Sequence, residues 1–212
     1  MKRIVTIVMA LMPMVTISSA TIDGFEEAYN KNLKDYIKDV PNLFAFNQIC
    51  VLSNGLETRL GAFNATYDYF FEWLKVDSEK EKPNRDNIRE NGVSIVYFIE
   101  GLLRKERLLD YVENFVLFDN QKYKIIAKNH QFLGVNNLIE SVEKKEELKG
   151  KLGVFWHTQG SGKSYSMVMF ARKVKRKITG NFTFLIITDR DDLDTQIHKN
   201  FVRTEVIGYN DE

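Results

Sequence analysis

The sequence predicts an α/β fold built on a parallel sheet. Three observations predict it: an apolar run over 153–156, a glycine-rich loop that ends in Gly162-Lys163-Ser164, and a second apolar run over 182–188. A helical pattern separates the two runs, and a strand, a helix and a strand in this order form a parallel pair with a right-handed crossover. The 212 residues allow one ordinary domain or two small ones.

Composition excludes several classes of protein. Apolar residues make up 44% and charged residues 28%, values typical of a soluble globular chain rather than a disordered, fibrous or multi-span membrane protein. The net charge of +1 excludes a strongly basic nucleic-acid binder, although a local basic surface is allowed. Cys50 is the single cysteine, so neither an internal disulfide nor a multi-cysteine zinc site is expected. Three histidines are too scattered in the sequence to predict a metal cluster: His130, His157 and His198.

The first twenty residues have a pattern of their own. Lys2-Arg3 precedes an apolar run from Ile4 to Ile17, and small residues follow, which is typical of a secretory signal. The run is shorter than the about 20 residues that a membrane-spanning helix needs. A core strand and a misplaced gene start remain as alternatives for this segment.

Residues 21–89 predict a helix, a hairpin and a linker. Apolar residues at helical spacing predict a helix over 21–38, after which Pro41 interrupts the chain. The apolar run 43–52 ends at Ser53-Asn54-Gly55, a turn signal that predicts a hairpin with a returning strand over 58–63. The charged stretch 77–89 contains Pro83 and is the best linker candidate.

The following elements lead to the glycine-rich loop. A wide apolar stripe predicts a helix within 91–116, and the pattern then changes to a strand-like run over 123–127. A helix is expected over 135–148, a buried strand over 153–156 and a helix over 163–178. The run 182–188 predicts a second buried strand.

A strand, a glycine-rich loop and a helix are the context that makes a phosphate-binding loop credible. Small residues let consecutive backbone amides point into one concavity, and the positive end of the following helix adds to the attraction for phosphate. Lys163 is expected to reach the β- and γ-phosphates, and the Ser164 hydroxyl to bind Mg²⁺. His157 stands where the generic pattern has a glycine.

Two charged segments beyond the loop admit two interpretations each. The helix 163–178 carries a basic face that is either near polyphosphate or nucleic acid or, more simply, solvated. Asp189 and Arg190 follow the second strand, where loops of a doubly wound sheet face a ligand. Arg190 is therefore a candidate contact to nucleic-acid backbone, whereas the neighbouring aspartates suit the start of the next helix.

Three stretches, 130–140, 154–173 and 184–197, resemble the motor subunit of type I restriction-modification enzymes. In that family the WHTQGSGKS form is usual, so His157 fits. The resemblance implies a RecA-like DNA translocase of superfamily two joined to a PD-(D/E)xK nuclease. It implies that Gln131 recognises adenine and that Asp189 and Arg190 contact DNA. The implied ATP-binding residues are Gln159, Gly160, Ser161, Gly162, Lys163 and Ser164, with Ser164 also binding Mg²⁺.

The resemblance also divides the chain. Residues 28–61 are similar to the end of the family's nuclease domain, with Asn32 in place of the glutamine of its QxxxY element. We therefore expect a signal-like or misplaced start over 1–20, a nuclease remnant over 21–76, a linker and connecting helix over 77–107, and the first part of the motor over 108–212. The nuclease carboxylates and a Walker B box are not found, so no catalytic residue is assigned and the isolated chain is expected to be inactive.

The function implied is that of an R-subunit fragment from an enzyme that translocates DNA with ATP and cleaves foreign DNA. Expected partners are double-stranded DNA and the modification and specificity subunits, with no membrane, in the cytoplasm. Another P-loop NTPase or kinase, and an exported protein without enzymatic activity, remain as alternatives.

Overall fold

The computed structural model describes residues 15–19, 24–54 and 56–206, and the chain forms two compact units. The first unit comprises Met1–Val112 and the second Glu113–Glu212. The boundary falls inside helix α5 (Lys105–Asn114). Within the described ranges, no helix is both long enough and apolar enough to cross a membrane. The predicted divisions after residues 20, 76 and 107 remain predictions.

A four-stranded sheet organises the first unit. Its strands lie in the order β1 (Val15–Ser19), β2 (Ile49–Ser53), β3 (Thr58–Gly61) and β4 (Phe71–Glu72), with β1 parallel to β2 and the other pairs antiparallel. The strand β1 corresponds to the core-strand alternative for the start of the chain, whereas residues 1–14 and 20 lie outside the described ranges. The sheet therefore begins within the segment that has a signal-like sequence.

The β2–β3 hairpin confirms the sequence prediction, and Asn54 explains where it turns. The Asn54 side-chain oxygen accepts the backbone N–H groups of Leu56 at 3.0 Å and Glu57 at 2.8 Å. An asparagine that caps its own turn in this way fixes the chain reversal locally. β2 is buried over Ile49–Leu52, but the predicted start of this strand at residue 43 is wrong. Pro41 instead opens a 3-10 turn (Pro41–Phe44), because proline suits the first turn of a helix.

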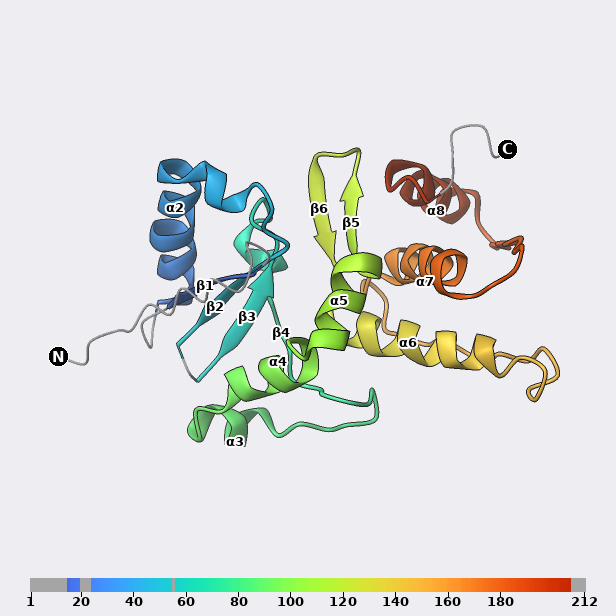
Figure 1. The fold of residues 1–212 in the computed structure, drawn as a ribbon, viewed down its shortest axis with the longest axis horizontal. Coiled ribbons are helices and arrows are strands. Elements are labelled where there is room, and N and C mark those ends of the chain that lie inside the picture. The colour runs from blue at the N-terminus through green and yellow to red at the C-terminus, as the bar shows by residue number, and fades with distance from the viewer. Residues whose placement is uncertain (1–14, 20–23, 55, 207–212) are drawn as a thin grey trace. The chain divides into compact units, whose positions relative to one another are not determined.

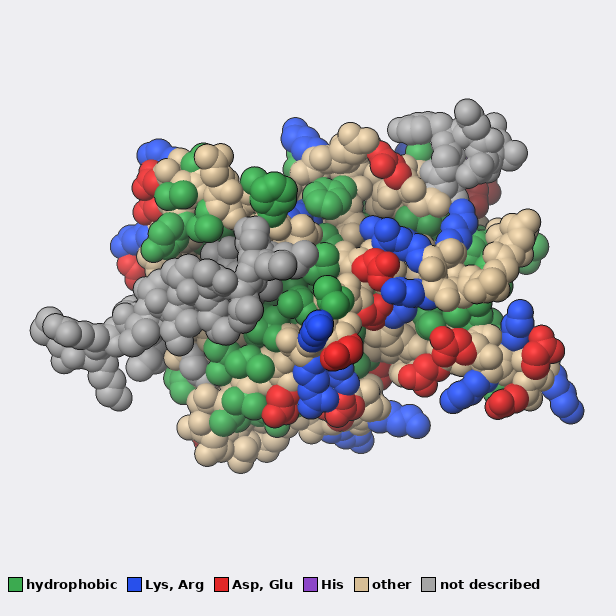
Figure 2. Space-filling model, in the orientation of Figure 1, with side chains coloured by type: hydrophobic (Ala, Val, Ile, Leu, Met, Phe, Trp, Pro, Cys, Tyr) green, Lys and Arg blue, Asp and Glu red, His purple; other side chains and the backbone are tan. Residues whose placement is uncertain are grey.

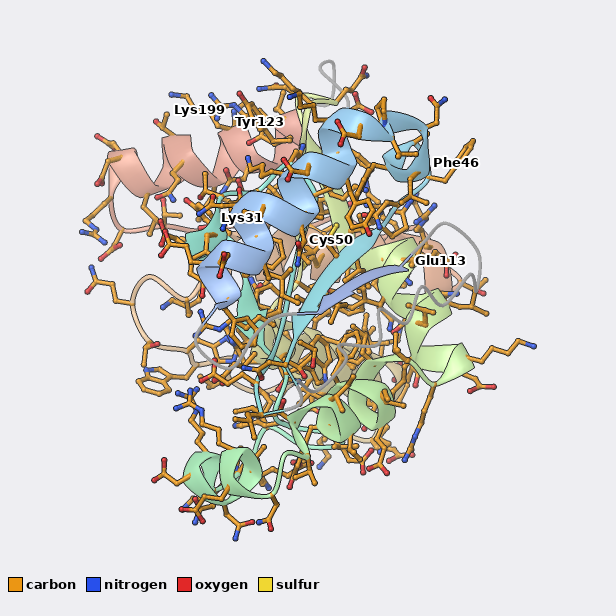
Figure 3. All side chains as sticks on the ribbon, turned by 90° about the vertical axis from the view of Figure 1, so that its left-hand side faces the viewer. Lys31, Phe46, Cys50, Glu113, Tyr123 and Lys199 are labelled. Atoms are coloured by element: carbon orange, nitrogen blue, oxygen red, sulfur yellow. The ribbon has the colours of Figure 1, made fainter. Side chains whose placement is uncertain are left out.

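A helical segment covers one face of this sheet and agrees with the helix predicted over 21–38, of which residues 21–23 lie outside the described ranges. It runs through α1 (Phe25–Glu27), a π-helical turn (Ala28–Leu33) and α2 (Lys34–Asp39). Figure 3 shows the segment lying over the strand that carries Cys50, with Lys31 on the outer side. Its apolar side packs in one cluster with β2, made of Phe25, Ala28, Tyr29, Leu33, Phe44, Cys50, Leu52 and Phe70. The cysteine is therefore a buried packing residue.

Three helices complete the first unit: α3 (Arg85–Glu90), α4 (Ser94–Leu102) and the start of α5, after a 3-10 turn (Tyr67–Tyr69). The stretch 77–89, predicted as a linker, thus includes most of the short helix α3, and the helix expected within 91–116 is divided into α4, which ends at Leu102, and α5, which begins at Lys105. Trp73 and Tyr111 are fully buried here, with their rings 5.8 Å apart in an edge-on arrangement. Burial raises the pKa of the Tyr111 hydroxyl well above its usual value, so this group stays neutral.

The charged stretch before α3 is ordered by Glu81. Its carboxylate accepts the backbone N–H groups of Val76 at 2.9 Å, Asp77 at 2.7 Å and Ser78 at 2.6 Å. Partial burial pushes the Glu81 pKa upward, but the three amides together push it further downward, so the pKa is lowered from 4.5.

We expect Glu81→Gln to destabilise the first unit by about 1 kcal/mol at pH 7, because charged hydrogen bonds are lost at a partly solvated site. A lowered folded-state pKa stabilises above the ordinary carboxyl pKa, and this contribution disappears as the pH falls through the folded value. Urea unfolding of wild type and variant should therefore differ at pH 7, and the difference should disappear as the pH falls through the lowered folded-state pKa of Glu81. Glu90→Gln, at an exposed position of α3, is the control; a constant difference at every pH would contradict the assignment.

The second unit contains a hairpin and three stacked helices. The strands β5 (Val116–Asp119) and β6 (Tyr123–Ile126) pair antiparallel, and α6 (Asn129–Glu143), α7 (Lys163–Lys177) and α8 (Asp191–Arg203) follow. Figure 1 shows α7 lying between α6 and α8. Ile139 and Val142 of α6 pack with Val174 of α7 in a core that Phe182 and Phe184 border. The start of α7 at Lys163 agrees with the sequence, whereas α6 begins six residues before the expected 135.

The parallel sheet expected around the glycine-rich loop is not found among the described residues. Neither 153–156 nor 182–188 forms a strand. Their side chains are highly exposed at alternate positions, namely Val154 (91%), Trp156 (76%), Leu185 (84%) and Ile187 (83%). A parallel strand requires hydrogen-bonded neighbours and a packed layer on both faces. In the described part of this unit the strands are β5 and β6, which pair only with each other. The two apolar segments therefore have no neighbouring strand to which they are hydrogen-bonded.

Candidate functional site

The glycine-rich loop leads directly into the N-terminus of α7. Gly160 and Gly162 have φ angles of 77° and 84°, a left-handed conformation that favours glycine. Gly162 is the N-cap residue of α7, no side chain caps this end, and no acidic residue lies in the first turn. A helix end of this kind offers unsatisfied amides and a positive dipole to an anion. A Cβ atom added at Gly160 would have no other atom within 4 Å, so the space beside this residue is open.

Lys163 lies folded back over the loop. Its ammonium group donates to the backbone carbonyls of His157 at 2.8 Å and Thr158 at 2.9 Å. These two weak partners hold a positive charge beside the helix end. A phosphate oxygen is a better acceptor for an ammonium group than a neutral carbonyl, because the hydrogen bond is then between two charged groups. The predicted role of Lys163 is therefore compatible with its position.

Gln131 and His130 lie in the first turn of α6, and both contact backbone carbonyls of the loop. The Gln131 amide nitrogen donates to the carbonyl of Gly162 at 2.9 Å and to the Ser166 hydroxyl at 3.2 Å. The Gln131 oxygen accepts the backbone N–H of Lys128 at 2.8 Å. Both ends of the carboxamide predicted to recognise adenine are thus engaged by protein atoms, and the side chain is buried.

Two of the three histidines meet at the loop, although their sequence spacing gave no sign of it. His130 Nε2 lies 3.1 Å from the carbonyl oxygen of Ser161. The rings of His130 and His157 are in edge-on contact, with their centroids 4.7 Å apart. The ring of Phe155 also packs edge-on against His157, with the two ring centroids 4.3 Å apart. Among the described residues, no group of three or more histidine, cysteine or acidic side chains could hold a metal ion. His130 and Phe155 both contact His157 at the start of the loop.

The remaining loop residues differ in exposure. Gln159 is exposed, and Ser164 is half-buried at the second position of α7. The Ser161 hydroxyl oxygen is buried and makes no hydrogen bond to the described part of the protein. An unsatisfied buried hydroxyl is costly, so this atom has a capacity for a ligand or for water.

Asp189 and Arg190 are both exposed at the start of α8. Their charged groups lie 3.9 Å apart, and Arg190 is the N-cap residue of the helix. Three aspartates occupy the first turn, Asp191, Asp192 and Asp194, which confirms the interpretation of this stretch as an acidic helix start. Asp189 also lines an apolar groove of about 360 Å³ with Met167 of α7 and Leu193 of α8. Contact of Asp189 and Arg190 with DNA remains a prediction.

The basic face of α7 is neither a free surface nor simply solvated. Arg172 donates to the carbonyl of Val116 at 2.8 Å, and Lys177 pairs with Glu113 at 2.6 Å. Arg176 donates to the carbonyl of Glu113, and Lys173 to Asn136 of α6. Burial lowers the pKa of the Arg172 guanidinium from its usual value. Figure 2 shows acidic and basic side chains next to one another on the face drawn. These side chains anchor α7 within its own unit.

The element that resembles QxxxY lies on the helix that covers the sheet of the first unit. Asn32 and Tyr36 are both exposed there, one turn apart, while Leu33 between them is buried. This arrangement leaves the two side chains on the solvent side of the helix, away from the cluster that packs on β2.

Comparison with known proteins finds similar proteins for both units. The profile of the type I restriction enzyme R protein N terminus matches residues 18–69, and that of the SWI2/SNF2 ATPase matches residues 130–211. The HindI endonuclease subunit of Haemophilus influenzae is 38% identical over 182 residues, which are 82% of this chain and 17% of that protein. A Methanocaldococcus jannaschii protein, provisionally named type I restriction enzyme MjaIXP endonuclease subunit, is 35% identical over 193 residues, 83% of this chain and 18% of that protein.

The chain therefore spans less than a fifth of the length of these curated relatives. A more distant relative, the SauCOLORF180P endonuclease subunit of Staphylococcus aureus, is 26% identical over 203 residues, covering 93% of this chain and 20% of that protein. Similarity that extends over most of both units identifies this protein as a homologue of the endonuclease subunits of type I restriction enzymes.

Proposed function

We propose that the chain binds the phosphates of ATP on the loop from His157 to Ser164. The observation that carries this proposal is the junction at Gly162, where a left-handed glycine joins the loop to an uncapped helix N-terminus with Lys163 beside it. The backbone amides and the Lys163 ammonium group would hold the phosphate oxygens, replacing the carbonyl partners of Lys163. The match of this unit to the SWI2/SNF2 ATPase family supports the choice of ATP.

Magnesium fits the site as a companion of the nucleotide rather than as a metal held by the protein alone. The described residues offer no cluster of three metal-ligating side chains, but Mg²⁺ is commonly bound by one or two protein oxygens together with phosphate and water. The half-buried Ser164 hydroxyl would be such an oxygen. When bound, Mg²⁺ would neutralise part of the negative charge of the phosphates.

For the whole protein we propose the role of an R subunit in a type I restriction enzyme. In this role ATP-dependent translocation precedes cleavage of double-stranded DNA, in the cytoplasm and together with modification and specificity subunits. Asp189 and Arg190, both exposed, would lie on the DNA side of the motor. The 35–38% identity to named endonuclease subunits supports this assignment.

Substitution of Lys163 tests the proposal. We expect Lys163→Ala to weaken binding of a fluorescent ATP analogue with Mg²⁺ by at least about tenfold, because a hydrogen bond to a charged group contributes about 1.5–3 kcal/mol. Lys175→Ala is the matched control, since it removes the same charge from the same helix at an exposed position. Equal affinities of the wild type and Lys163→Ala would remove the loop from the binding site.

A further inference from the structure

The imidazole of His130 reaches one backbone carbonyl of the glycine-rich loop from the first turn of α6. Its Nε2 atom lies 3.1 Å from the carbonyl oxygen of Ser161, which follows it by 31 residues in the chain. A carbonyl oxygen can only accept a hydrogen bond, so Nε2 must carry the hydrogen. The contact therefore assigns to His130 either the neutral Nε2–H tautomer or the imidazolium form, with the side chain as donor.

This hydrogen bond sets the direction of the peptide group between Ser161 and Gly162. In a trans peptide the C=O of one residue and the N–H of the next point in opposite directions. Because the Ser161 carbonyl faces His130, the Gly162 N–H points away from α6. Gly162 is the N-cap residue of α7, so its amide adjoins the uncapped helix end and adds to the donors that attract phosphate. The opposite orientation of this peptide would present a carbonyl oxygen, which repels a phosphate.

A second contact, with His157, holds the His130 ring in the orientation that this hydrogen bond needs. The two imidazole planes are nearly perpendicular, at 89°, and their centroids are 4.7 Å apart. If the His130 ring turned over, a carbon atom would take the place of Nε2 beside the Ser161 carbonyl, and no donor would remain there. A neighbouring ring in edge-on contact opposes such a rotation. His157, which stands where the generic phosphate loop has a glycine, therefore supplies a ring that a glycine could not.

We propose that His130 is a positioning residue for the phosphate-binding loop, and that His157 supports its ring. The Nε2–H group of His130 holds the Ser161–Gly162 peptide with its N–H available to the phosphates. The peptide is then oriented before a ligand arrives, and binding does not have to supply the free energy of ordering it. This inference rests on the proposed phosphate-binding function of the loop. It concerns the phosphates of the ligand and leaves recognition of the base to other residues.

Two substitutions of His130 separate its hydrogen bond from its ring contact. His130→Phe keeps a ring that can pack on His157 but has no donor, whereas His130→Gln has no ring but carries an amide nitrogen that can donate near the position of Nε2. Calorimetry measures the affinity of each variant for inorganic pyrophosphate with Mg²⁺. We expect His130→Phe to bind about five- to tenfold more weakly than the wild type and His130→Gln to stay within about threefold of it, because one neutral hydrogen bond is lost in the first case and replaced in the second.

His198→Phe is the matched control, since it makes the same change at an exposed position of α8 and should leave pyrophosphate binding unchanged. Wild-type affinity of His130→Phe would overturn the proposal. Equal weakening by His130→Phe and His130→Gln would overturn it too, because the loss would then not follow the hydrogen bond. If Lys163→Ala leaves pyrophosphate affinity unchanged, the phosphate-binding function itself is wrong, which is a separate result from a failure of the His130 variants alone.

The tautomer of His130 provides a second test, on the wild-type chain. Long-range ¹H–¹⁵N correlation spectra distinguish the two ring nitrogens of each histidine, and we expect the hydrogen of neutral His130 on Nε2, both with and without pyrophosphate and Mg²⁺. The Nδ1–H tautomer would place the lone pair of Nε2 opposite the Ser161 oxygen, so its observation would overturn the proposal. Because this measurement needs no substitution, it decides the question even if His130→Phe does not fold.

Discussion

Replacing Gly162 by alanine is expected to remove most nucleotide binding while leaving the helical core folded. Gly162 has a φ of 84°, which costs a residue with a Cβ about 1–2 kcal/mol. The new Cβ would also lie 2.9 Å from the Gln131 nitrogen and displace it from the Gly162 carbonyl. With the loss of that hydrogen bond, about 1 kcal/mol, affinity for ATP and pyrophosphate should fall by roughly 30-fold or more.

Gly160→Ala provides the comparison that separates strain from contact. Gly160 has a similar φ of 77°, but a Cβ there would meet no atom within 4 Å. This variant should therefore weaken binding through backbone strain alone, by about 5- to 30-fold and by less than Gly162→Ala. A Gly162→Ala, Gln131→Ala double variant relieves the contact and should lose less than the sum of the two single changes. Equal effects of Gly160→Ala and Gly162→Ala would show that the contact with Gln131 has no role in binding.

The local part of the site could be predicted from the sequence, and the tertiary part could not. Glycines before Gly162-Lys163-Ser164 specify their own backbone conformation, and α7 begins at Lys163 as expected. The contact of Gln131 with Gly162 joins residues 31 positions apart, and spacing carries no information about it. The Gln131 side chain does accept the backbone N–H of Lys128, but the residue at the cap position is a lysine, so the usual sequence signature of a helix start is incomplete and did not mark the beginning of α6.

The two apolar runs at 153–156 and 182–188 show the corresponding limit for strands. A helix such as α7 closes its hydrogen bonds within its own residues, so periodicity alone specifies it. A parallel strand depends on partners that are distant in sequence, and an apolar run records only that burial would be favourable. The β2–β3 hairpin could be predicted because its partner follows immediately, after a turn that Asn54 defines. The anchoring role of the basic residues of α7 could not be predicted either, because their partners Glu113 and Val116 precede the loop by some forty residues.

Replacing Gly101 by alanine is expected to destabilise the first unit, although helix propensity alone predicts that alanine stabilises a helix relative to glycine. Alanine normally stabilises a helix interior by about 1 kcal/mol relative to glycine. A Cβ at position 101 of α4, however, would lie 2.3 Å from Nε1 and 2.7 Å from Cδ1 of Trp73, and 3.2 Å from the carbonyl of Lys75. Trp73 is fully buried against Tyr111 and cannot withdraw into solvent. Overpacking of this kind costs about 2–3 kcal/mol, which corresponds to a fall in Tm of about 10–20 °C for a unit of this size.

Thermal unfolding followed by circular dichroism measures this effect, and two further variants assign it. Glu100→Ala, at the exposed neighbouring position of α4, should change the Tm by no more than a few degrees. Trp73→Phe removes the indole edge that the new methyl group would strike, so the Gly101→Ala, Trp73→Phe double variant should be more stable than the sum of the single effects predicts, by about 1 kcal/mol or more. If Gly101→Ala is as stable as the wild type, helix propensity has prevailed, and Trp73 must be able to move within its pocket at little cost. If the single effects simply add, the loss arises from the backbone near Lys75 and not from the packing of the indole ring against α4.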